Sequence, residues 1–223
     1  AKGKYIMLLN NDTLVDPDFA KPIIDAFAAT PEVGIVASKI WFHHSPGVVQ
    51  YAGSSDINPL TLSSFATGWG NKDEGQYAQA GFTHLAHGAA MTVSKEAIAK
   101  AGLMEASYFL YYEELDWCER IRKAGYSILV QPKAKIYHKE SVSVGQTNPM
   151  KTYYLTRNRI LCMAKNRSKA EFIVFTLFLF LVMIPKNSLM YLLKGQKEHF
   201  SAFWRAIKWN FSDNAERKAV WEE

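Results

Sequence analysis

The stretch YIMLLNNDT at residues 5–13 decides the fold class of this chain. Its first five residues form a continuous apolar run, which is typical of a buried parallel strand, and the polar residues that follow mark the strand's end. Asp16 and Pro17 then mark a helix start, with the aspartate as N-cap and the proline at the first helical position. A strand followed by a helix predicts an α/β fold with polar groups at the C-terminal edge of its sheet.

The alternation of strand and helix signals extends to residue 138. Two further helices are expected, one capped by Ser94 and one that begins near Glu113. Residues 43–82 are rich in Gly, Ser, Asn and Pro and lack a sustained period, which is typical of a long loop that serves binding. Further strands are expected at residues 33–37, 87–93, 126–130 and 134–137.

Length and charge indicate one compact domain followed by an appendage. The chain has 223 residues, 48% apolar and 21% charged, which is enough for one α/β core. Residues 1–150 hold 13 Lys and Arg against 15 Asp and Glu, whereas residues 151–223 hold 13 against 6. We therefore expect a catalytic part at 1–150 and a region at 151–223 that meets an anionic surface. Nucleic-acid binding is not indicated, because the basic residues accompany long apolar runs.

Cysteine usage and the first residues bear on the setting of the protein. Cys118 and Cys162 have neither the spacing of a zinc site nor that of a disulfide framework, which favours a reducing, cytoplasmic environment. The first segment already has the pattern of a buried strand, so we expect the chain to be a fragment of a longer protein.

The region after residue 150 has the composition of a membrane-associated helical segment. Residues 172–184 form an apolar stretch of thirteen residues, interrupted by Thr176 alone and followed by Pro185. At about 1.5 Å per residue they reach about 20 Å, short of a hydrocarbon core of about 30 Å. With a second apolar piece at 189–193, the pattern favours a re-entrant or interfacial hairpin over a single span. Aromatic and aliphatic residues then share one helical face, with basic residues available for head groups: Phe200, Phe203, Trp204, Ile207 and Phe211.

Two residues at strand ends are candidate metal ligands. Asp12 follows the first strand and His138 ends the last one. A carboxylate oxygen with an imidazole suits a divalent cation such as Mn²⁺ or Mg²⁺, which would neutralise a departing diphosphate. Each residue alone also has a simpler interpretation, since Asp12 could cap a turn and His138 could be a surface histidine with ordinary partners.

Three carboxylates, on Glu113, Glu114 and Asp116, occur in the first turn of one predicted helix, after an aromatic run. Like-charge repulsion favours one carboxyl group that acts as a general base near neutral pH, although the helix N-terminus opposes this effect. The alternative is that they only complement the helix dipole. Arg157 and Arg159 carry guanidinium groups suited to phosphate, either of a donor diphosphate or of lipid head groups.

Several motifs occur in the order seen in one enzyme family. They are YIMLLNNDT at 5–13, HGAAM at 87–91, YFLYYEELDWCER at 108–120, YH at 137–138 and YYLTRNR at 153–159. Together they resemble glycosyltransferase family 2, in particular its bacterial rhamnosyltransferase-like members. The resemblance implies a partial GT-A fold, with a Rossmann-like mixed sheet flanked by helices, and an inverting single displacement. It also implies that the family's N-terminal nucleotide-binding half precedes residue 1.

The resemblance also implies roles for single residues. Asp12 would hold the metal and the donor diphosphate with His138, and Asn10 and Asn11 would complete the family's Asp-x-Asp element, in which Asn10 replaces the first aspartate. Glu114 stands where the family has its catalytic aspartate and would be the base. Glu113 and Asp116 would orient that base or bind acceptor hydroxyls. The segment that would line the donor sugar and acceptor is His87, Gly88 and Ala89.

These implications define the expected reaction and two alternatives. We expect a sugar, with rhamnose as one candidate, to move from a nucleotide-diphosphate donor to a glycan or lipid-linked acceptor at the cytoplasmic face of the plasma membrane, in cell-surface polysaccharide synthesis. One alternative is a metal-dependent phosphohydrolase, which needs a denser set of Asp and His ligands. The other is a non-catalytic, membrane-associated carbohydrate-binding module.

Overall fold

The computed structural model describes residues 1–139 and 148–212, which fall into two compact units. The sheet unit comprises Ala1–Ile57, Ser63–Met104 and Glu114–Ser141. The helical unit comprises Asn58–Leu62, Glu105–Glu113 and Val142–Glu223. The short segment before the three carboxylates thus belongs with the later helices rather than with the sheet.

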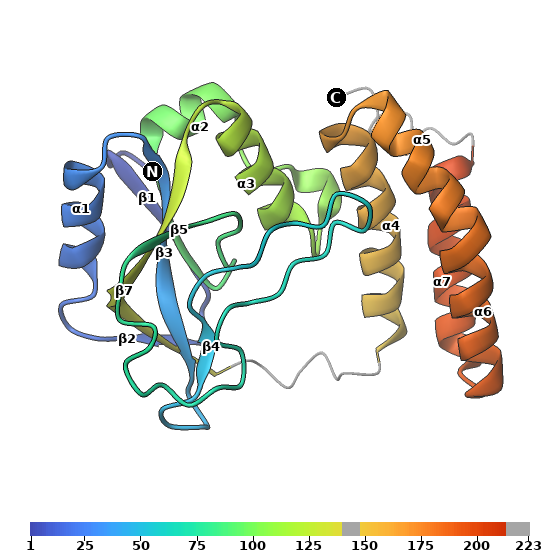
Figure 1. Cartoon of the computed structure of the whole chain (residues 1–223), viewed down its shortest axis with the longest axis horizontal. Helices are drawn as coiled ribbons and strands as arrows, with labels where there is room; N and C mark the ends of the chain where they lie inside the picture. The colour runs from blue at the N-terminus through green and yellow to red at the C-terminus, as the bar shows by residue number, and fades with distance from the viewer. Residues whose placement is uncertain (140–147, 213–223) are drawn as a thin grey trace. The chain divides into compact units, whose positions relative to one another are not determined.

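The sheet unit is built on a seven-stranded mixed sheet (Figure 1). Its central strands β3 and β7 are parallel, while the pairs β1 with β6, β6 with β3 and β7 with β2 are antiparallel. The order is β1 (Tyr5–Leu9), β6 (Ala90–Ser94), β3 (Val33–Phe42), β7 (Ser127–His138) and β2 (Thr13–Val15), with β4 (Val49–Tyr51) on β3 and β5 (Gly81–Thr83) on β7.

Two expectations about strands are corrected. The run at 5–9 is a strand, but it is a half-buried, antiparallel one, because it pairs with β6 rather than lying between parallel neighbours. The segments at 126–130 and 134–137 form one strand, β7, whose pairing with β3 shifts between Gln131 and Lys135. An apolar run indicates a strand, but it does not show whether the neighbouring strand is parallel or antiparallel, because the pairing is set by residues distant in sequence.

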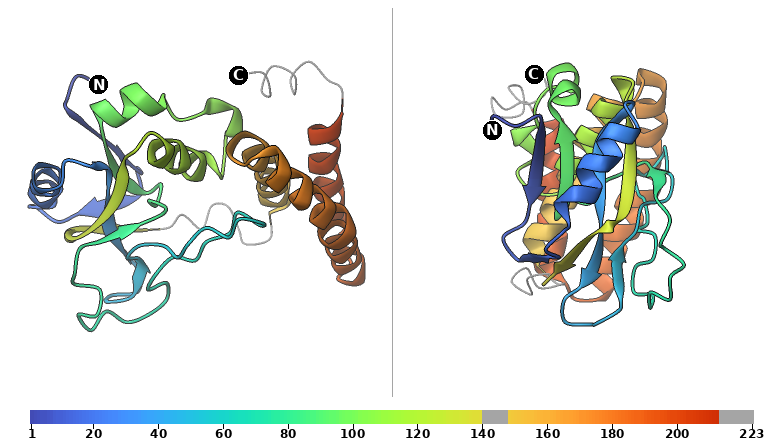
Figure 2. Two further views of the ribbon diagram at one scale, coloured as in Figure 1. Left: turned by 45° about the horizontal axis from the view of Figure 1, so that its top comes forward. Right: turned by 90° about the vertical axis from the view of Figure 1, so that its left-hand side faces the viewer.

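Helices cover both faces of the sheet, as Figures 1 and 2 show. Successive side chains of a strand point to opposite faces. Ile35 and Ala37 of β3 therefore pack with α2 (Lys95–Ala101) and α3 (Glu113–Lys123), whereas Val36 between them packs with α1 (Ala20–Ala29). The core on the α2 and α3 side includes Trp117, Cys118 and Ile121, and the core on the α1 side includes Ile23 and Phe27.

The three helices predicted before residue 139 are present, but the first one begins later than predicted. Ser94 is the N-cap of α2, since its hydroxyl accepts the Ala97 N–H at 3.1 Å. The first helix begins at Ala20 rather than beside Asp16, whose carbonyl accepts the Phe19 N–H in a preceding turn at 3.1 Å. The side chains of Cys118 and Cys162 are both buried thiols.

The helical unit consists of η1 (Ala106–Tyr108), α4 (Pro149–Asn166), α5 (Lys169–Phe178), the π-helical segment η2 (Leu179–Met183), α6 (Ile184–Leu193) and α7 (Lys197–Phe211). Asn148 caps α4, and a capping box between Ser168 and Glu171 starts α5. Phe203 and Ile207 of α7 are buried, whereas Trp204 is 41% exposed. The aromatic face expected to meet head groups is thus partly core.

Residues 169–193 form one long helix, which corrects the expected break at Pro185. Segments α5, η2 and α6 are continuous, and the π-helical turn just before Pro185 accommodates its missing N–H. Within the described ranges this helix, Lys169–Leu193, is long and apolar enough to cross a membrane by length and composition, and an 18-residue window in it has a mean hydropathy of 2.0. Its 25 residues reach about 37 Å at about 1.5 Å each.

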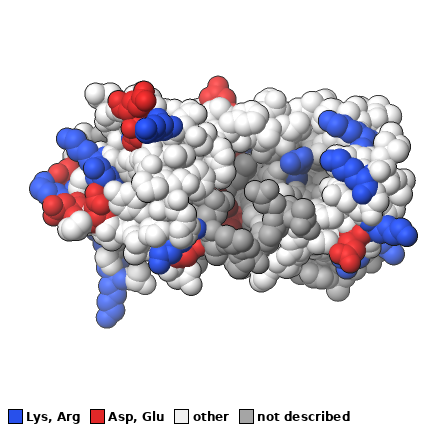
Figure 3. Space-filling view, turned by 90° about the horizontal axis from the view of Figure 1, so that it is seen from below, with Lys and Arg blue, Asp and Glu red and all other residues white. Residues whose placement is uncertain are grey.

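Much of the long helix is uncovered. Leu181 is 74% exposed, and Ile173, Leu177 and Leu192 are each exposed by more than half. Figure 3 shows basic side chains over the helical unit on one face of the molecule, with wide uncharged areas between them. The long helix thus leaves a large apolar surface exposed within the helical unit.

Candidate active site

A tight turn after β1 places Asp12 at the edge of the sheet. The Asn10 N–H donates to the Ala89 carbonyl at 3.0 Å, and the Asn10 carbonyl accepts from the Thr13 hydroxyl at 2.7 Å. Thr13 then pairs with His138 in the register of β2 and β7. The polar turn and the end of β7 thus lie together.

Asp12, His138 and Gln50 form a hydrogen-bonded series. Asp12 Oδ1 lies 3.1 Å from His138 Nε2, and His138 Nδ1 lies 2.9 Å from Gln50 Oε1. Because Gln50 Oε1 can only accept, Nδ1 carries a proton in this arrangement, and Nε2 faces the carboxylate. Gln50 is buried on β4, inside the segment expected to be a long loop, and its sequence neighbours give no signal of a site.

The geometry of this pair fits two ligands of one divalent cation. Adjacent ligands that each lie about 2.1 Å from an octahedral ion are about 3 Å apart, and the Asp12 and His138 atoms are 3.1 Å apart. Gln50 would orient the imidazole, as outer partners of metal-bound histidines do. Within the part of the chain that the structure describes, no group of three or more His, Cys, Asp or Glu residues could hold an ion. Other ligands would therefore be water or phosphate oxygens.

His87 lies beside this pair and is uncharged at neutral pH. Its Nδ1 accepts the Ala89 N–H at 3.1 Å, so the ring proton is on Nε2. The ring centroids of His87 and His138 are 6.1 Å apart. Burial, with a smaller contribution from His138, lowers the pKa of His87 to about 4. His87 can therefore donate a hydrogen bond without adding a positive charge next to Asp12 and His138.

Glu114 approaches the same edge of the sheet unit through Gly88. A Cβ at position 88 would lie 3.5 Å from Glu114 Oε1, in ordinary van der Waals contact, so the Glu114 carboxylate lies against the Gly88 backbone. Burial, and to a smaller extent the Glu114 carboxylate, raises the pKa of Cys118 to about 12. The structure thus brings together Asp12, His87, Gly88, Glu114 and His138, five of the predicted site residues.

The other two carboxylates have different surroundings. Asp116 is 1% exposed and pairs with Arg120, with Oδ2 2.8 Å from Nε. Arg120 also donates to the carbonyls of Ala101 and Leu103, so the pair ties α3 to the segment after α2. This arrangement favours a structural role for Asp116 over the predicted contact with an acceptor. Glu113 begins α3 but belongs to the helical unit.

A strained loop precedes the carboxylates. Phe109, Tyr111 and Tyr112 have φ of 62°, 66° and 75°, a region in which non-glycine residues cost about 1–3 kcal/mol each. The fully buried Asn158 holds this loop, because its Nδ2 donates to the carbonyls of Tyr108, Leu110 and Tyr111 at 2.7–2.9 Å. In the sequence, the feature that draws attention to Asn158 is its position in the motif YYLTRNR at 153–159.

Arg157 is packed inside the helical unit. It is 5% exposed, its Nη2 donates to the Ser107 carbonyl at 2.9 Å, and its guanidinium lies 4.0 Å from the centre of the Trp209 ring. This environment favours a role in positioning the segment before the strained loop over the predicted contact with a diphosphate. Trp209, whose ring the guanidinium contacts, is also buried and belongs to the core.

Comparisons with known proteins give partial similarities. No protein-family model matches the chain. The chain is 32% identical over 82 residues to a dTDP-rhamnosyl transferase of Shigella flexneri, covering 33% of this chain and 28% of that protein. It is 30% identical over 86 residues to a low-salt glycan biosynthesis hexosyltransferase of Haloferax volcanii, covering 38% of this chain and 28% of that protein.

The longest of these similarities is to a protein of undefined role. An uncharacterized protein of Sinorhizobium fredii is 26% identical over 152 residues, or 65% of this chain and 16% of that protein. The chain therefore spans between 16% and 28% of the length of these relatives. Two of these three relatives are sugar transferases.

Proposed function

We propose that this chain carries the catalytic part of an inverting glycosyltransferase with a GT-A fold, of the kind found in glycosyltransferase family 2. The observation that carries the proposal is the meeting of Asp12 and His138 with Gly88 and Glu114 at one edge of the mixed sheet. The partial similarity to a rhamnosyl and a hexosyl transferase supports the same class of reaction.

Asp12 and His138 would hold a divalent cation, Mn²⁺ or Mg²⁺, together with the diphosphate of a nucleotide-sugar donor. Bound there, the ion would supply positive charge for the departing diphosphate. Asn10 and Asn11 shape the turn that presents Asp12. The phosphohydrolase alternative would need more ligands than the described residues bring together at this edge.

Glu114 is the proposed general base. The proton of an acceptor hydroxyl moves to the Glu114 carboxylate while the acceptor oxygen bonds to the anomeric carbon. The bond from that carbon to the diphosphate oxygen breaks, the nucleoside diphosphate leaves with the bonding electrons, and the anomeric configuration is inverted. His87 would donate a hydrogen bond from Nε2 to the sugar or acceptor, since it is neutral and its Nδ1 is engaged by Ala89.

The proposed setting is the cytoplasmic face of the plasma membrane, with a glycan or lipid-linked acceptor. The exposed apolar surface of the helix Lys169–Leu193 and the basic composition of residues 151–223 support a membrane partner. Rhamnose is the proposed sugar because one relative is a dTDP-rhamnosyl transferase.

The reaction class is tested with the parent-length protein in membranes, supplied with Mn²⁺ or Mg²⁺ and UDP-, dTDP- and GDP-sugars in turn. The proposal predicts release of a nucleoside diphosphate from one donor with incorporation of its sugar into an acceptor. Metal-dependent release of inorganic phosphate without sugar incorporation would instead establish a phosphohydrolase. Saturable sugar binding by a folded protein without any turnover would establish a binding module.

A further inference from the structure

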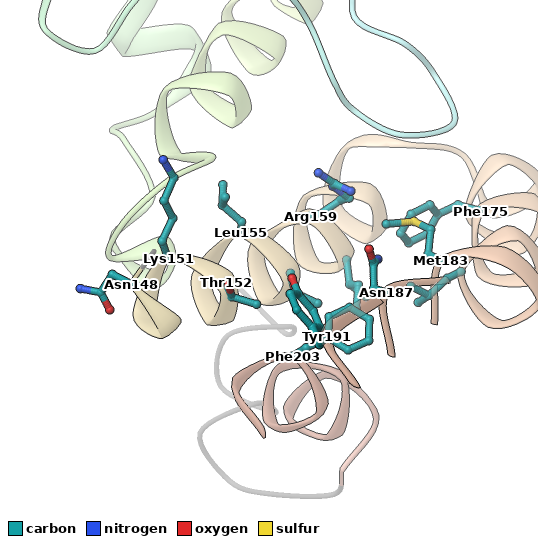
Figure 4. Close-up of a pocket in the computed structure, with 13 residues that line it drawn as sticks. Asn148, Lys151, Thr152, Leu155, Arg159, Phe175, Met183, Asn187, Tyr191 and Phe203 are labelled. Atoms are coloured by element: carbon teal, nitrogen blue, oxygen red, sulfur yellow. The ribbon is translucent and has the colours of Figure 1, made fainter. Parts of the chain in front are cut away.

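The helical unit encloses a cavity of about 290 Å³ between α4, the long helix and α7. Figure 4 shows Arg159, Asn187 and Tyr191 projecting into its middle, with Met183 and Phe175 to one side and Lys151 to the other. The volume is close to the lower end of the range of small-molecule sites, about 300–1,000 Å³. None of these residues has a role in the proposed sugar transfer.

The charged residues that line this cavity are both cationic. Among the residues that the structure describes, Lys151 and Arg159 line it, and no Asp or Glu does. Arg159 Nε donates to the Tyr112 hydroxyl at 2.8 Å, and burial raises the pKa of Tyr112, so that this partner is neutral. Within the described ranges, neither cation is within ion-pair distance of a carboxylate. The Arg159 guanidinium is held at Nε by Tyr112 and has no carboxylate partner among the described residues. Its terminal N–H groups are therefore suited to an anion such as phosphate.

The wall that faces α4 changes from apolar to polar along the long helix. Its cavity-lining residues recur every fourth position, as Phe175, Leu179, Met183, Asn187 and Tyr191. Phe175 and Leu179 are almost fully buried and close the apolar end, the half-buried Met183 gives the accessible hydrocarbon surface, and the last two give an amide and a hydroxyl. Other faces of the same helix expose apolar side chains, Leu181 by 74%. A ligand matched to this wall has a polar head joined to a hydrocarbon chain.

We propose that this cavity binds the head of a single-chain lipid phosphate. The phosphate lies on the Arg159 guanidinium with the Asn187 amide beside it, Lys151 adds positive charge from the rim, and the first part of the chain packs on Met183. The site lies within the helical unit and is independent of the proposed sugar transfer. Binding can therefore be measured without any turnover.

The test uses hexadecyl phosphate as probe, titrated by calorimetry into the purified parent-length protein in an uncharged maltoside detergent. Hexadecylphosphocholine, with the same chain and no net charge, and inorganic phosphate are the comparison probes. We expect saturable binding of hexadecyl phosphate with at least tenfold higher affinity than either. Equal binding of the phosphocholine would mean partition by the chain alone, and equal binding of inorganic phosphate would mean a free-anion site; each would overturn the proposal.

Variants locate the binding. Arg159→Gln removes the fork, and Met183→Trp fills the cavity from its apolar side while both cations remain. Each should weaken hexadecyl phosphate binding by at least tenfold, with an unchanged far-ultraviolet circular dichroism spectrum for the second. Lys186→Gln removes an exposed cation of the same helix outside the cavity and should bind as the wild type does. Wild-type affinity in Met183→Trp, or an equal loss in Lys186→Gln, would overturn the assignment.

Discussion

Asp12 Oδ1 lies 3.1 Å from His138 Nε2, although 126 positions separate the two residues in the chain. The antiparallel pairing of β2 with β7 creates this contact, since Thr13 stands opposite His138. The sheet register therefore places a carboxylate and an imidazole at a spacing that suits two ligands of one metal ion. The pair is the basis of the metal prediction.

Asp12→Asn keeps the size of the side chain and removes its charge. We expect affinity for Mn²⁺ in the presence of a nucleoside diphosphate to fall on the order of 100-fold, because a direct ligand contributes at least as much as an outer partner. Electron paramagnetic resonance of free Mn²⁺ measures this loss. Asp18→Asn, an exposed aspartate before α1, is the matched control and should bind Mn²⁺ normally. Equal affinity in the two variants would remove Asp12 from the site.

Gln50→Leu tests the partner that orients His138. Loss of the bond from His138 Nδ1 to Gln50 Oε1 leaves the imidazole without its outer partner, and we expect about 10–100-fold weaker metal affinity. The exposed Gln79→Leu is the control. A Gln50→Leu protein that is folded and binds Mn²⁺ as tightly as the wild type would show that the contact has no role in metal binding.

The position of Gln50 illustrates what sequence reasoning could not reach. Asp12, His138 and Glu114 were recognisable because each follows a strand or starts a helix, which are local signals. Gln50 lies in the long loop-rich segment, and it reaches the site only because β4 pairs with β3 beside β7. That relation depends on pairing between distant residues, for which the sequence around Gln50 has no local signal.

Structural context also explains the other differences between the predicted and the observed structure. Pro185 is a strong helix-breaking signal, yet a preceding π-helical turn absorbs its missing donor and the helix continues to Leu193. Asp116 and Arg157 have the residue types of a site, but tertiary packing gives them Arg120 and Trp209 as partners. Residue type alone therefore does not distinguish a site residue from a member of a structural pair, because tertiary packing supplies the partner.

The low pKa of His87 predicts a loss of stability in acid. Its folded pKa of about 4 lies below the ordinary value of 6.5, so between these values the unfolded chain binds more protons. Its contribution is therefore complete above pH 6.5 and is lost as the pH falls toward 4, by up to about 3 kcal/mol. Urea unfolding at pH 6.5 and 4.5 should show a smaller pH effect in His87→Asn, whose amide oxygen can accept the Ala89 N–H. Equal pH effects would contradict this account.

Asn158→Asp tests the support of the strained loop. The variant has the same size but presents a carboxylate to three carbonyl oxygens. We expect a loss of about 2–4 kcal/mol of stability, since each lost bond contributes about 1 kcal/mol and a buried charge is left uncompensated. Hydrogen exchange should show faster opening at residues 108–112. Asn166→Asp on the same helix is the control, and equal protection of 108–112 in both variants would contradict the assignment.

The central claim, that Glu114 is the base of a sugar transfer at this edge of the sheet, is tested most directly by Glu114→Gln. Transfer from the preferred donor and equilibrium binding of its nucleoside diphosphate are measured side by side, with Glu96→Gln, an exposed carboxylate in the first turn of α2, as control. The account predicts that Glu114→Gln binds the nucleotide as the wild type does and transfers sugar at least 100-fold more slowly, the scale of general base catalysis. Wild-type transfer by Glu114→Gln would contradict it.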